Sequence, residues 1–106
     1  MNNYLGDLEE LVLMVVSGLN GQGYGVTICD ALNKANRRIS ISATQATLTR
    51  LEAKGYISSE LGDPTPERGG RRKKFYQVTG VGQRALADAE ARRAKIRRMI
   101  LATTEG

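Results

Sequence analysis

Residues 42 to 57 constrain the fold more than any other stretch, because their pattern predicts a short helix with a defined start and a defined end. Ser42 and Gln45 have the spacing of a capping box, in which each side chain accepts a backbone N–H of the first turn. Gly55 supplies the left-handed residue that commonly ends a helix. We therefore expect a helix that is capped by Ser42 and stops before Gly55.

The two faces of this predicted helix differ in chemistry. At about 100° per residue, one stripe collects residues suited to a core, and it consists of Thr44, Thr47, Leu48 and Leu51. The opposite face is small and hydrogen-bonding with one arginine, and it consists of Ser42, Gln45, Ala46, Thr49 and Arg50. A helix that enters a DNA major groove needs such a face. An ordinary solvated face has the same composition, so the flanking segments decide between the two interpretations.

Length and charge limit the classes of function. The chain has 106 residues, enough for one domain with one modest core, and chains this small often gain stability by oligomerising. Its formal charge of +5 favours a polyanionic partner or an anionic surface. It has no histidine and a single cysteine, Cys29, which excludes an intrachain disulfide and the usual zinc sites. We expect no cofactor and no metal, and a reducing cytoplasm suits this composition.

The sequence gives no sign of a membrane segment or an export signal. The longest apolar run, from Leu11 to Val16, is much shorter than the roughly 20 residues of a membrane-spanning helix. Acidic residues precede this run, where a signal peptide is basic.

The first third of the chain predicts two helices. Apolar residues recur at steps of three and four from Leu5 to Leu19, which predicts a core-building first helix. Tyr24, Ile28 and Leu32 predict a second helix that ends near Asn36. Ile39-Ser40-Ile41 alternates as a short strand does. The second and third helices should therefore form a helix-turn-helix with a strand fragment in its turn.

A basic hairpin is predicted after the third helix. Tyr56 to Leu61 and Lys74 to Thr79 alternate as two antiparallel strands, joined by a loop over residues 62–73 that is too long for a tight turn. The loop and the start of the second strand carry cations without an acid from Arg68 onward, and the candidate DNA contacts there are Arg68, Gly70, Arg71, Arg72, Lys73 and Lys74. Such a wing grips phosphates or enters a minor groove, whereas the alternative is a solvated charge run.

The last segment predicts one helix, capped by Thr79 and running from Gly80 to about Ala102. Its apolar stripe is narrow and flanked by arginines. A second copy of the chain is the expected partner for the stripe; the alternative is a helix that folds back on its own domain. We divide the chain into a DNA-binding part, residues 1–79, and a dimerisation helix with a short tail, residues 80–106. The order of elements predicts an α+β, mainly α fold, the winged helix-turn-helix.

Four stretches also resemble the PadR family of bacterial transcriptional regulators, over about Leu5 to Leu86. The stretches are Leu5-Gly6-x-x-Glu9-Glu10-Leu11-Val12-Leu13, Tyr24-Gly25-Val26-x-Ile28, Leu48-x-Arg50-Leu51-Glu52-x-Lys54-Gly55-Tyr56-Ile57, and Glu67-Arg68-Gly69-Gly70-Arg71-Arg72-Lys73-Lys74-Phe75-Tyr76-x-Val78-Thr79-x-x-Gly82. The family commonly has Gly-x-Leu-Tyr where this chain has Ser42-Ala43-Thr44-Gln45, so the family's tyrosine contact to the DNA backbone is missing at position 45.

The resemblance implies a homodimeric repressor at a palindromic operator in double-stranded DNA, released from DNA by a small molecule in some members. It implies a dimer formed by the first and last helices, with Leu8, Val12, Val15, Ala85, Ala89, Ile96, Met99 and Ile100 as its residues. Drug-sensing relatives hold flat aromatic ligands between tryptophans, and this chain has no tryptophan. A pocket lined by Leu11, Val15 and the last helix is the alternative effector site.

Three other classes of function compete with a DNA-binding regulator. An enzyme is not indicated, since there is no histidine, no nucleophile with a base, and no phosphate-binding loop. A protein-interaction module without specific DNA binding is the main rival, because winged helices also bind proteins. A basic amphipathic helix on a membrane surface is the third alternative, for residues 84 to 101, but its apolar side is rich in alanine.

Overall fold

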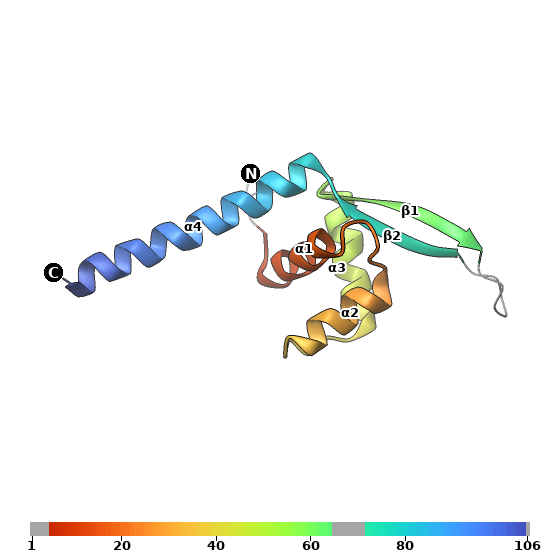
Figure 1. The fold of residues 1–106 in the computed structure, drawn as a ribbon, viewed down its shortest axis with the longest axis horizontal. Coiled ribbons are helices and arrows are strands. Elements are labelled where there is room, and N and C mark those ends of the chain that lie inside the picture. Colours follow the sequence, from red (N-terminus) through yellow and green to blue (C-terminus); the bar gives the residue numbers. More distant parts are fainter. Residues whose placement is uncertain (1–4, 65–71, 106) are drawn as a thin grey trace.

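The computed structural model describes residues 5–64 and 72–105 and confirms the winged helix-turn-helix (Figure 1). Three helices come first, followed by a two-stranded hairpin and a long last helix. In chain order the elements are α1 (Asp7–Leu19), α2 (Gly25–Lys34), α3 (Ile41–Ala53), β1 (Ile57–Pro64), β2 (Arg72–Val78) and α4 (Gly80–Glu105).

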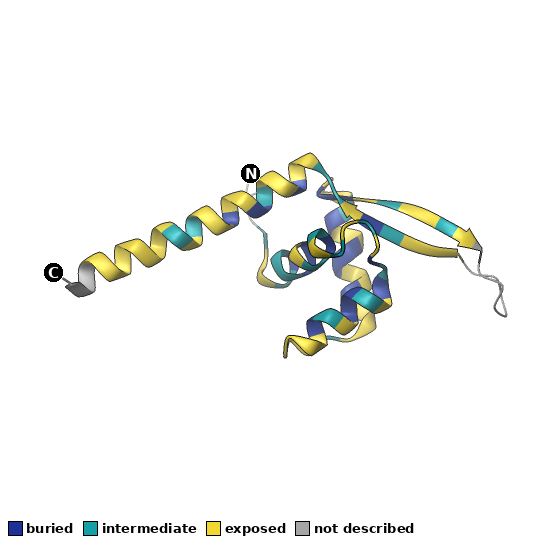
Figure 2. Ribbon diagram, viewed as in Figure 1, coloured by how far each residue is buried: buried dark blue, intermediate teal, exposed yellow. Residues whose placement is uncertain are grey.

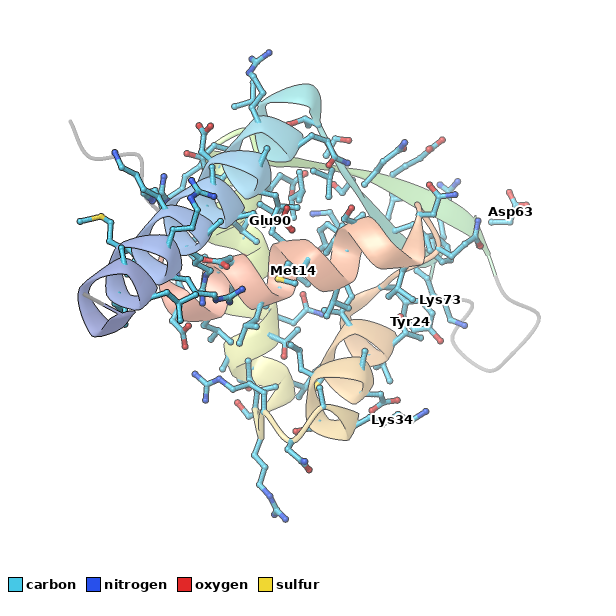
Figure 3. The ribbon with its side chains drawn as sticks, turned by 60° about the vertical axis from the view of Figure 1, so that its left-hand side comes forward. Met14, Tyr24, Lys34, Asp63, Lys73 and Glu90 are labelled. Atoms are coloured by element: carbon cyan, nitrogen blue, oxygen red, sulfur yellow. The ribbon has the colours of Figure 1, made fainter. Side chains whose placement is uncertain are left out.

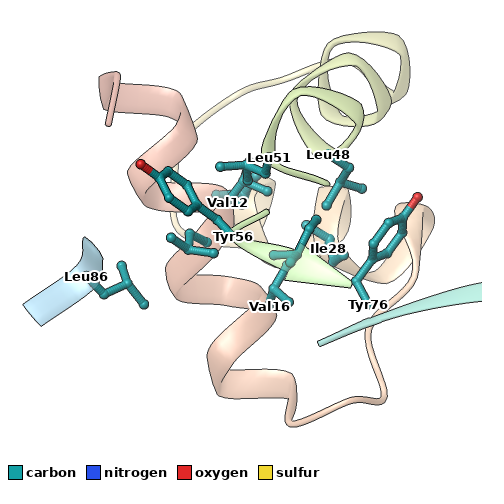
Figure 4. Close-up of a cluster of buried hydrophobic side chains, with 11 residues drawn as sticks. Val12, Val16, Ile28, Leu48, Leu51, Tyr56, Tyr76 and Leu86 are labelled. Carbon is teal, nitrogen blue, oxygen red and sulfur yellow. The ribbon is translucent and has the colours of Figure 1, made fainter. Parts of the chain in front are cut away.

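The core lies where α1, α2 and α3 meet the base of the hairpin (Figure 4). Val12, Leu13, Ile28 and Leu48 have no exposed surface, and each such side chain contributes about 1.5–3 kcal/mol by leaving water. The stripe predicted to face the core from the third helix is confirmed. All four of its residues are fully buried, namely Thr44, Thr47, Leu48 and Leu51. The two threonines satisfy their hydroxyls within the helix, by donating to backbone carbonyl oxygens four residues earlier.

The predicted N-cap of α3 is wrong by two residues. Ser40, not Ser42, is the N-cap, and its extended backbone lets the side chain accept the N–H of Ala43 at 3.0 Å. Helix α3 begins at Ile41, so the predicted strand fragment Ile39-Ser40-Ile41 is not present. Instead, the amide side chain of Asn33 braces the turn, by accepting the Ile39 N–H at 3.0 Å and donating to the Ile39 carbonyl oxygen at 3.4 Å.

The predicted end of α3 is confirmed. Gly55 has a φ of +80° directly after the C-cap. Its N–H donates to the Glu52 carbonyl oxygen, and the Tyr56 N–H donates to the Leu51 carbonyl oxygen, each at 3.0 Å. This is the Schellman arrangement, which satisfies the last carbonyls of the helix and turns the chain sharply into β1.

The strands pair antiparallel, with Ile57 opposite Val78 and Glu60 opposite Phe75. They extend further than predicted, because Pro64 still pairs with Arg72 after an irregularity that follows Leu61. Residues 62–64 and 72–73 therefore belong to strands rather than to the predicted loop. A third segment joins the hairpin edge, where the Tyr76 N–H donates to the Gly23 carbonyl oxygen at 3.0 Å. This bridge fixes the hairpin against the loop that follows α1.

Helix α4 begins as predicted, with the Thr79 hydroxyl accepting the Gly82 N–H at 3.1 Å. Its first half packs on the domain through Leu86 and Ala89, which are buried. Its second half extends away from the domain and is exposed almost all round (Figure 2). The alternative in which the whole helix folds back on its own domain is therefore wrong for the second half.

Candidate nucleic-acid interface

The outer face of α3 is exposed at every position predicted to meet DNA, which are Ser42, Gln45, Ala46, Thr49 and Arg50. The inner face of the same helix is fully buried, so α3 cannot turn this surface inward without losing the core. The side chains differ in freedom, however. The Thr49 hydroxyl donates to the Gln45 carbonyl oxygen at 3.0 Å. The Arg50 side chain lies near Glu9 of α1, and the Gln45 amide lies against the start of α2.

Glu9, in the first turn of α1, forms ion pairs with Arg50 and Lys54. Lys54 Nζ lies 2.7 Å and 3.0 Å from the two Glu9 carboxylate oxygens, and Arg50 Nε lies 3.8 Å from Oε2. Arg50 also donates to the Thr47 hydroxyl at 3.2 Å. Nothing local in the sequence indicates this partner for Glu9, because Lys54 lies 45 residues away.

The charge state of Glu9 follows from this setting. Its side chain is only 10% exposed. Burial raises the pKa of the Glu9 carboxyl. The hydrogen bonds from Lys54 and from the Gly6 N–H, together with the charges of Lys54 and Arg50, outweigh burial and bring the pKa below its ordinary value of 4.5. Glu9 is thus a carboxylate at neutral pH and anchors the C-terminal half of α3 to α1.

Gln45 lies against the start of α2. A Cβ on Gly25 would stand 2.0 Å from Gln45 Nε2, so the absence of a side chain at position 25 is what admits the glutamine amide. The amide is therefore at the edge of the exposed face that is nearer to α2.

Three of the predicted wing residues, Arg72, Lys73 and Lys74, are exposed on β2, and each has a contact that orients it. Arg72 Nε donates to the Gly62 carbonyl oxygen at 2.8 Å. Lys73 Nζ lies 4.6 Å from the centre of the Tyr24 ring, where Figure 3 shows the two side chains together. The predicted contacts Arg68, Gly70 and Arg71 lie outside the described residues.

The hairpin is tied directly to α3 through Glu52. The Glu52 carboxylate accepts a hydrogen bond from the Ser59 hydroxyl of β1 and lies 3.4 Å from Lys74 Nζ of β2. The hydrogen bond from Ser59 is the largest cause of a lowered pKa of the Glu52 carboxyl, and the nearby Lys74 lowers it further. Burial acts in the opposite direction but is outweighed. The exposed face of α3 and the cations of β2 are thus parts of one braced surface.

Sequence reasoning assigned no role to Arg37 and Arg38. Both are exposed in the turn between α2 and α3, directly before the Ser40 cap. Their position beside the N-terminus of α3 adds positive charge at the end of the helix that already favours anions. The local signal was present in the sequence, as a pair of arginines ahead of the predicted helix.

The predicted dimer residues have different surroundings. Val12 and Ala89 are covered by their own chain and offer no surface to a partner in this structure. Three more are half-buried, namely Leu8, Val15 and Ala85. In the second half of α4, Ile96, Met99 and Ile100 are 56%, 59% and 59% exposed. The middle of α4 is anchored by Arg93, whose Nε lies 2.9 Å from the Glu10 carboxylate of α1.

A pocket of about 230 Å³ lies between α4 and the N-terminal segment, with Leu5, Tyr56, Val81, Arg84, Ala85, Asp88 and Arg92 as its lining. It is not the pocket predicted from Leu11 and Val15, which are absent from its lining. Across residues 5–64 and 72–105, no three His, Cys, Asp or Glu side chains come together as a metal site. No helix in the same part of the chain has the length and apolar character needed to cross a membrane.

The solved structures that superpose on this chain include transcriptional regulators of the PadR family. A PadR-like transcription factor from Bacteroides fragilis superposes with a TM-score of 0.76 at 22% identity, over 91% of this chain and 88% of the other. The smu.1704 protein of Streptococcus mutans gives 0.70 at 29% identity, over 100% and 95%. A PadR family transcriptional regulator from Eggerthella lenta gives 0.69 at 25% identity, over 93% and 87%. A search of curated protein sequences finds no match.

The family model of the PadR-like transcriptional regulators matches residues 12–88, which run from the middle of α1 through α2, α3 and the hairpin into the start of α4. Sequence and architecture thus agree over most of the chain, and the protein belongs to the PadR-like family of transcriptional regulators.

Proposed function

We propose that this protein is a homodimeric transcriptional repressor that binds a palindromic operator in duplex DNA. The observation that carries the proposal is the surface on which the exposed face of α3 and the cations of β2 are braced together by Glu52. Helix α3 supplies contacts to base edges and the hairpin supplies contacts to phosphates, the division of labour of a winged helix on DNA.

The dimer is proposed from the second half of α4. Exposed isoleucines at positions 96 and 100 face the same side of a helix that its own domain does not cover. A partner helix would bury them. In this proposal residues 1–79 bind DNA and residues 80–106 hold the dimer. Two-fold symmetry would then place the two α3 helices in successive major grooves, about 34–36 Å apart.

Release by a small molecule is the third part of the proposal. The pocket between α4 and the N-terminal segment borders both the domain and the helix that would carry the dimer. An effector bound there would act on the angle of α4, and through that angle on the spacing of the two α3 helices. The pocket has apolar walls together with both basic and acidic side chains, Arg84, Arg92 and Asp88, which suits a small amphipathic ligand.

Fluorescence anisotropy tests the proposal, with the duplex upstream of the protein's own gene and a random duplex, each at several salt concentrations. The proposal requires tight binding to the promoter with two chains per site and a steep dependence on salt. Weak binding of equal strength to both duplexes would overturn it. The exposed stripe of α4 would then favour a protein-interaction module.

A further inference from the structure

The outer face of α3 carries exposed methyl groups beside its hydrogen-bonding side chains. The Thr49 hydroxyl uses its proton on the Gln45 carbonyl oxygen, at 3.0 Å. A threonine whose hydroxyl is turned back to the preceding turn has its methyl group as the other branch of the side chain. Thr49 is exposed, so this methyl group is available to a partner.

The neighbouring positions add to this surface. Ala46 is exposed one turn away from Thr49 and presents a single methyl group. At the N-terminal end of α3, Ile41 is 44% exposed although it is branched and apolar. The amide of Gln45 lies at the edge of this face, against Gly25. Ser42 is the remaining small hydroxyl of this surface.

An exposed isoleucine at the first position of a recognition helix has a chemical use. The N-terminal residues of such a helix are the ones that reach base edges. In the major groove thymine is marked by its C5 methyl group, and apolar side chains such as alanine and the threonine methyl group recognise it by contact. Cytosine and the purines offer no such group.

We propose that Thr49, Ala46 and Ile41 form a methyl-reading surface, and that the operator half-site carries thymines whose C5 methyl groups pack against it. This inference rests on the proposed function, since it requires α3 to enter the major groove. It specifies what that function leaves open, namely the base class that the helix selects. The signal was hidden in the sequence, because Thr49 counts there as a hydrogen-bonding residue and Ile41 as part of a strand.

The test replaces each thymine of the footprinted half-site by deoxyuridine, which removes only the C5 methyl group. We expect a loss of affinity of about three- to fivefold at one or two positions, the scale of one buried methyl group. The protein variants are Thr49→Ser, which keeps the hydroxyl and deletes the methyl group, and Thr49→Val, which keeps a methyl group and deletes the hydroxyl. Ile41→Ala probes the other end of the surface, and circular dichroism checks that each variant is folded.

The expected result is a position at which the natural protein and Thr49→Val distinguish thymine from deoxyuridine, whereas Thr49→Ser or Ile41→Ala binds both equally. If the natural protein binds the operator specifically but ignores every replacement, the methyl-reading surface is overturned and the DNA-binding function stands. The same conclusion follows if neither Thr49→Ser nor Ile41→Ala changes the sensitivity. If the promoter and random duplexes bind equally, the proposed function itself fails.

Discussion

Lys54 at the end of α3 is held by Glu9 at the start of α1, with its ammonium nitrogen 2.7 Å and 3.0 Å from the two carboxylate oxygens. The next residue, Glu10, holds Arg93 of α4 at 2.9 Å. One turn of α1 therefore contacts both the helix proposed to read DNA and the helix proposed to form the dimer. The relative placement of those two helices depends on adjacent carboxylates.

Glu9→Gln should destabilise the fold by about 1–2 kcal/mol at neutral pH, because it removes a charged acceptor that is mostly buried and doubly hydrogen-bonded. Chemical denaturation measures the difference in unfolding free energy. Glu90→Gln, at an exposed position on α4, is the matched control and should change stability little.

The Glu9 effect should also depend on pH with a defined sign. The pKa of Glu9 is lowered from 4.5 in the folded protein. Its stabilisation is therefore fully present above about pH 4.5 and is lost as the pH falls through the folded pKa. The difference between the natural protein and Glu9→Gln should shrink from pH 7 toward pH 3. A constant difference over that range would contradict this account.

Two glycines at the start of α4 should respond oppositely to alanine. A Cβ on Gly82 would lie 2.1 Å from the Tyr56 carbonyl oxygen, and backbone cannot yield as a side chain does. Gly82→Ala should cost about 1–3 kcal/mol. A Cβ on Gly80 meets nothing within 4 Å, so Gly80→Ala should be neutral or stabilise by up to about 1 kcal/mol. Thermal denaturation compares them, and equal effects would show that this close contact does not restrict position 82 to glycine.

The sequence predicted the helices and the hairpin because their signals are local. The stripe of α3 appears in a helical projection, and Gly55 marks its end through its own conformational freedom. The exact start of α3 was missed for a reason that is not local. Ser40 and Ser42 both suit a cap, and the choice of Ser40 depends on Asn33, which binds the Ile39 backbone across the turn.

In the candidate site, too, local features were predictable from the sequence and long-range contacts were not. Exposure of the five predicted α3 positions follows from periodicity. Three contacts of the site join elements that are far apart in the chain, and no spacing rule indicates them. They are the ion pair of Glu9 with Lys54, the contact of Gln45 with Gly25, and the ion pair of Glu52 with Lys74. The burial of Val12 and Ala89 also depends on tertiary packing. An apolar stripe in the sequence does not indicate whether its residues face the core of their own chain or a partner chain.

Gln45 should affect preference among operator sequences rather than overall affinity. Gln45→Ala should change the ratio of affinities for operators that differ at one base pair by about 1–3 kcal/mol, if the amide contacts a base edge. Gly25→Ala displaces the same amide without removing it and should alter preference at the same base pair. Anisotropy with single-base variants measures both. A uniform loss over all operators would assign Gln45 to the DNA backbone.

The wing should contribute through phosphate contacts. Arg72→Ala should weaken binding to every duplex and reduce the slope of log affinity against log salt by about one unit, the effect of one lost phosphate contact. Arg84→Ala, which removes the same charge from α4, is the control and should leave the slope nearly unchanged. If the two variants give the same slope, net charge rather than a wing contact explains the salt dependence.

The second half of α4 should decide the oligomeric state. Ile96 and Ile100 are more than half exposed in the single chain, and burial of an aspartate against a partner helix is costly. Ile100→Asp should therefore raise the dimer dissociation constant by about 100-fold or more, measured by sedimentation equilibrium, and weaken operator binding in parallel. Ala91→Asp places the same charge on the opposite side of α4 and should leave the dimer intact.

Since the core ends before Ile96, Ile100→Asp should unfold at the same temperature as the natural protein under conditions where both are monomeric. A dimer that survives Ile100→Asp would move the interface to another surface, and the half-buried residues of α1 would be the first to examine.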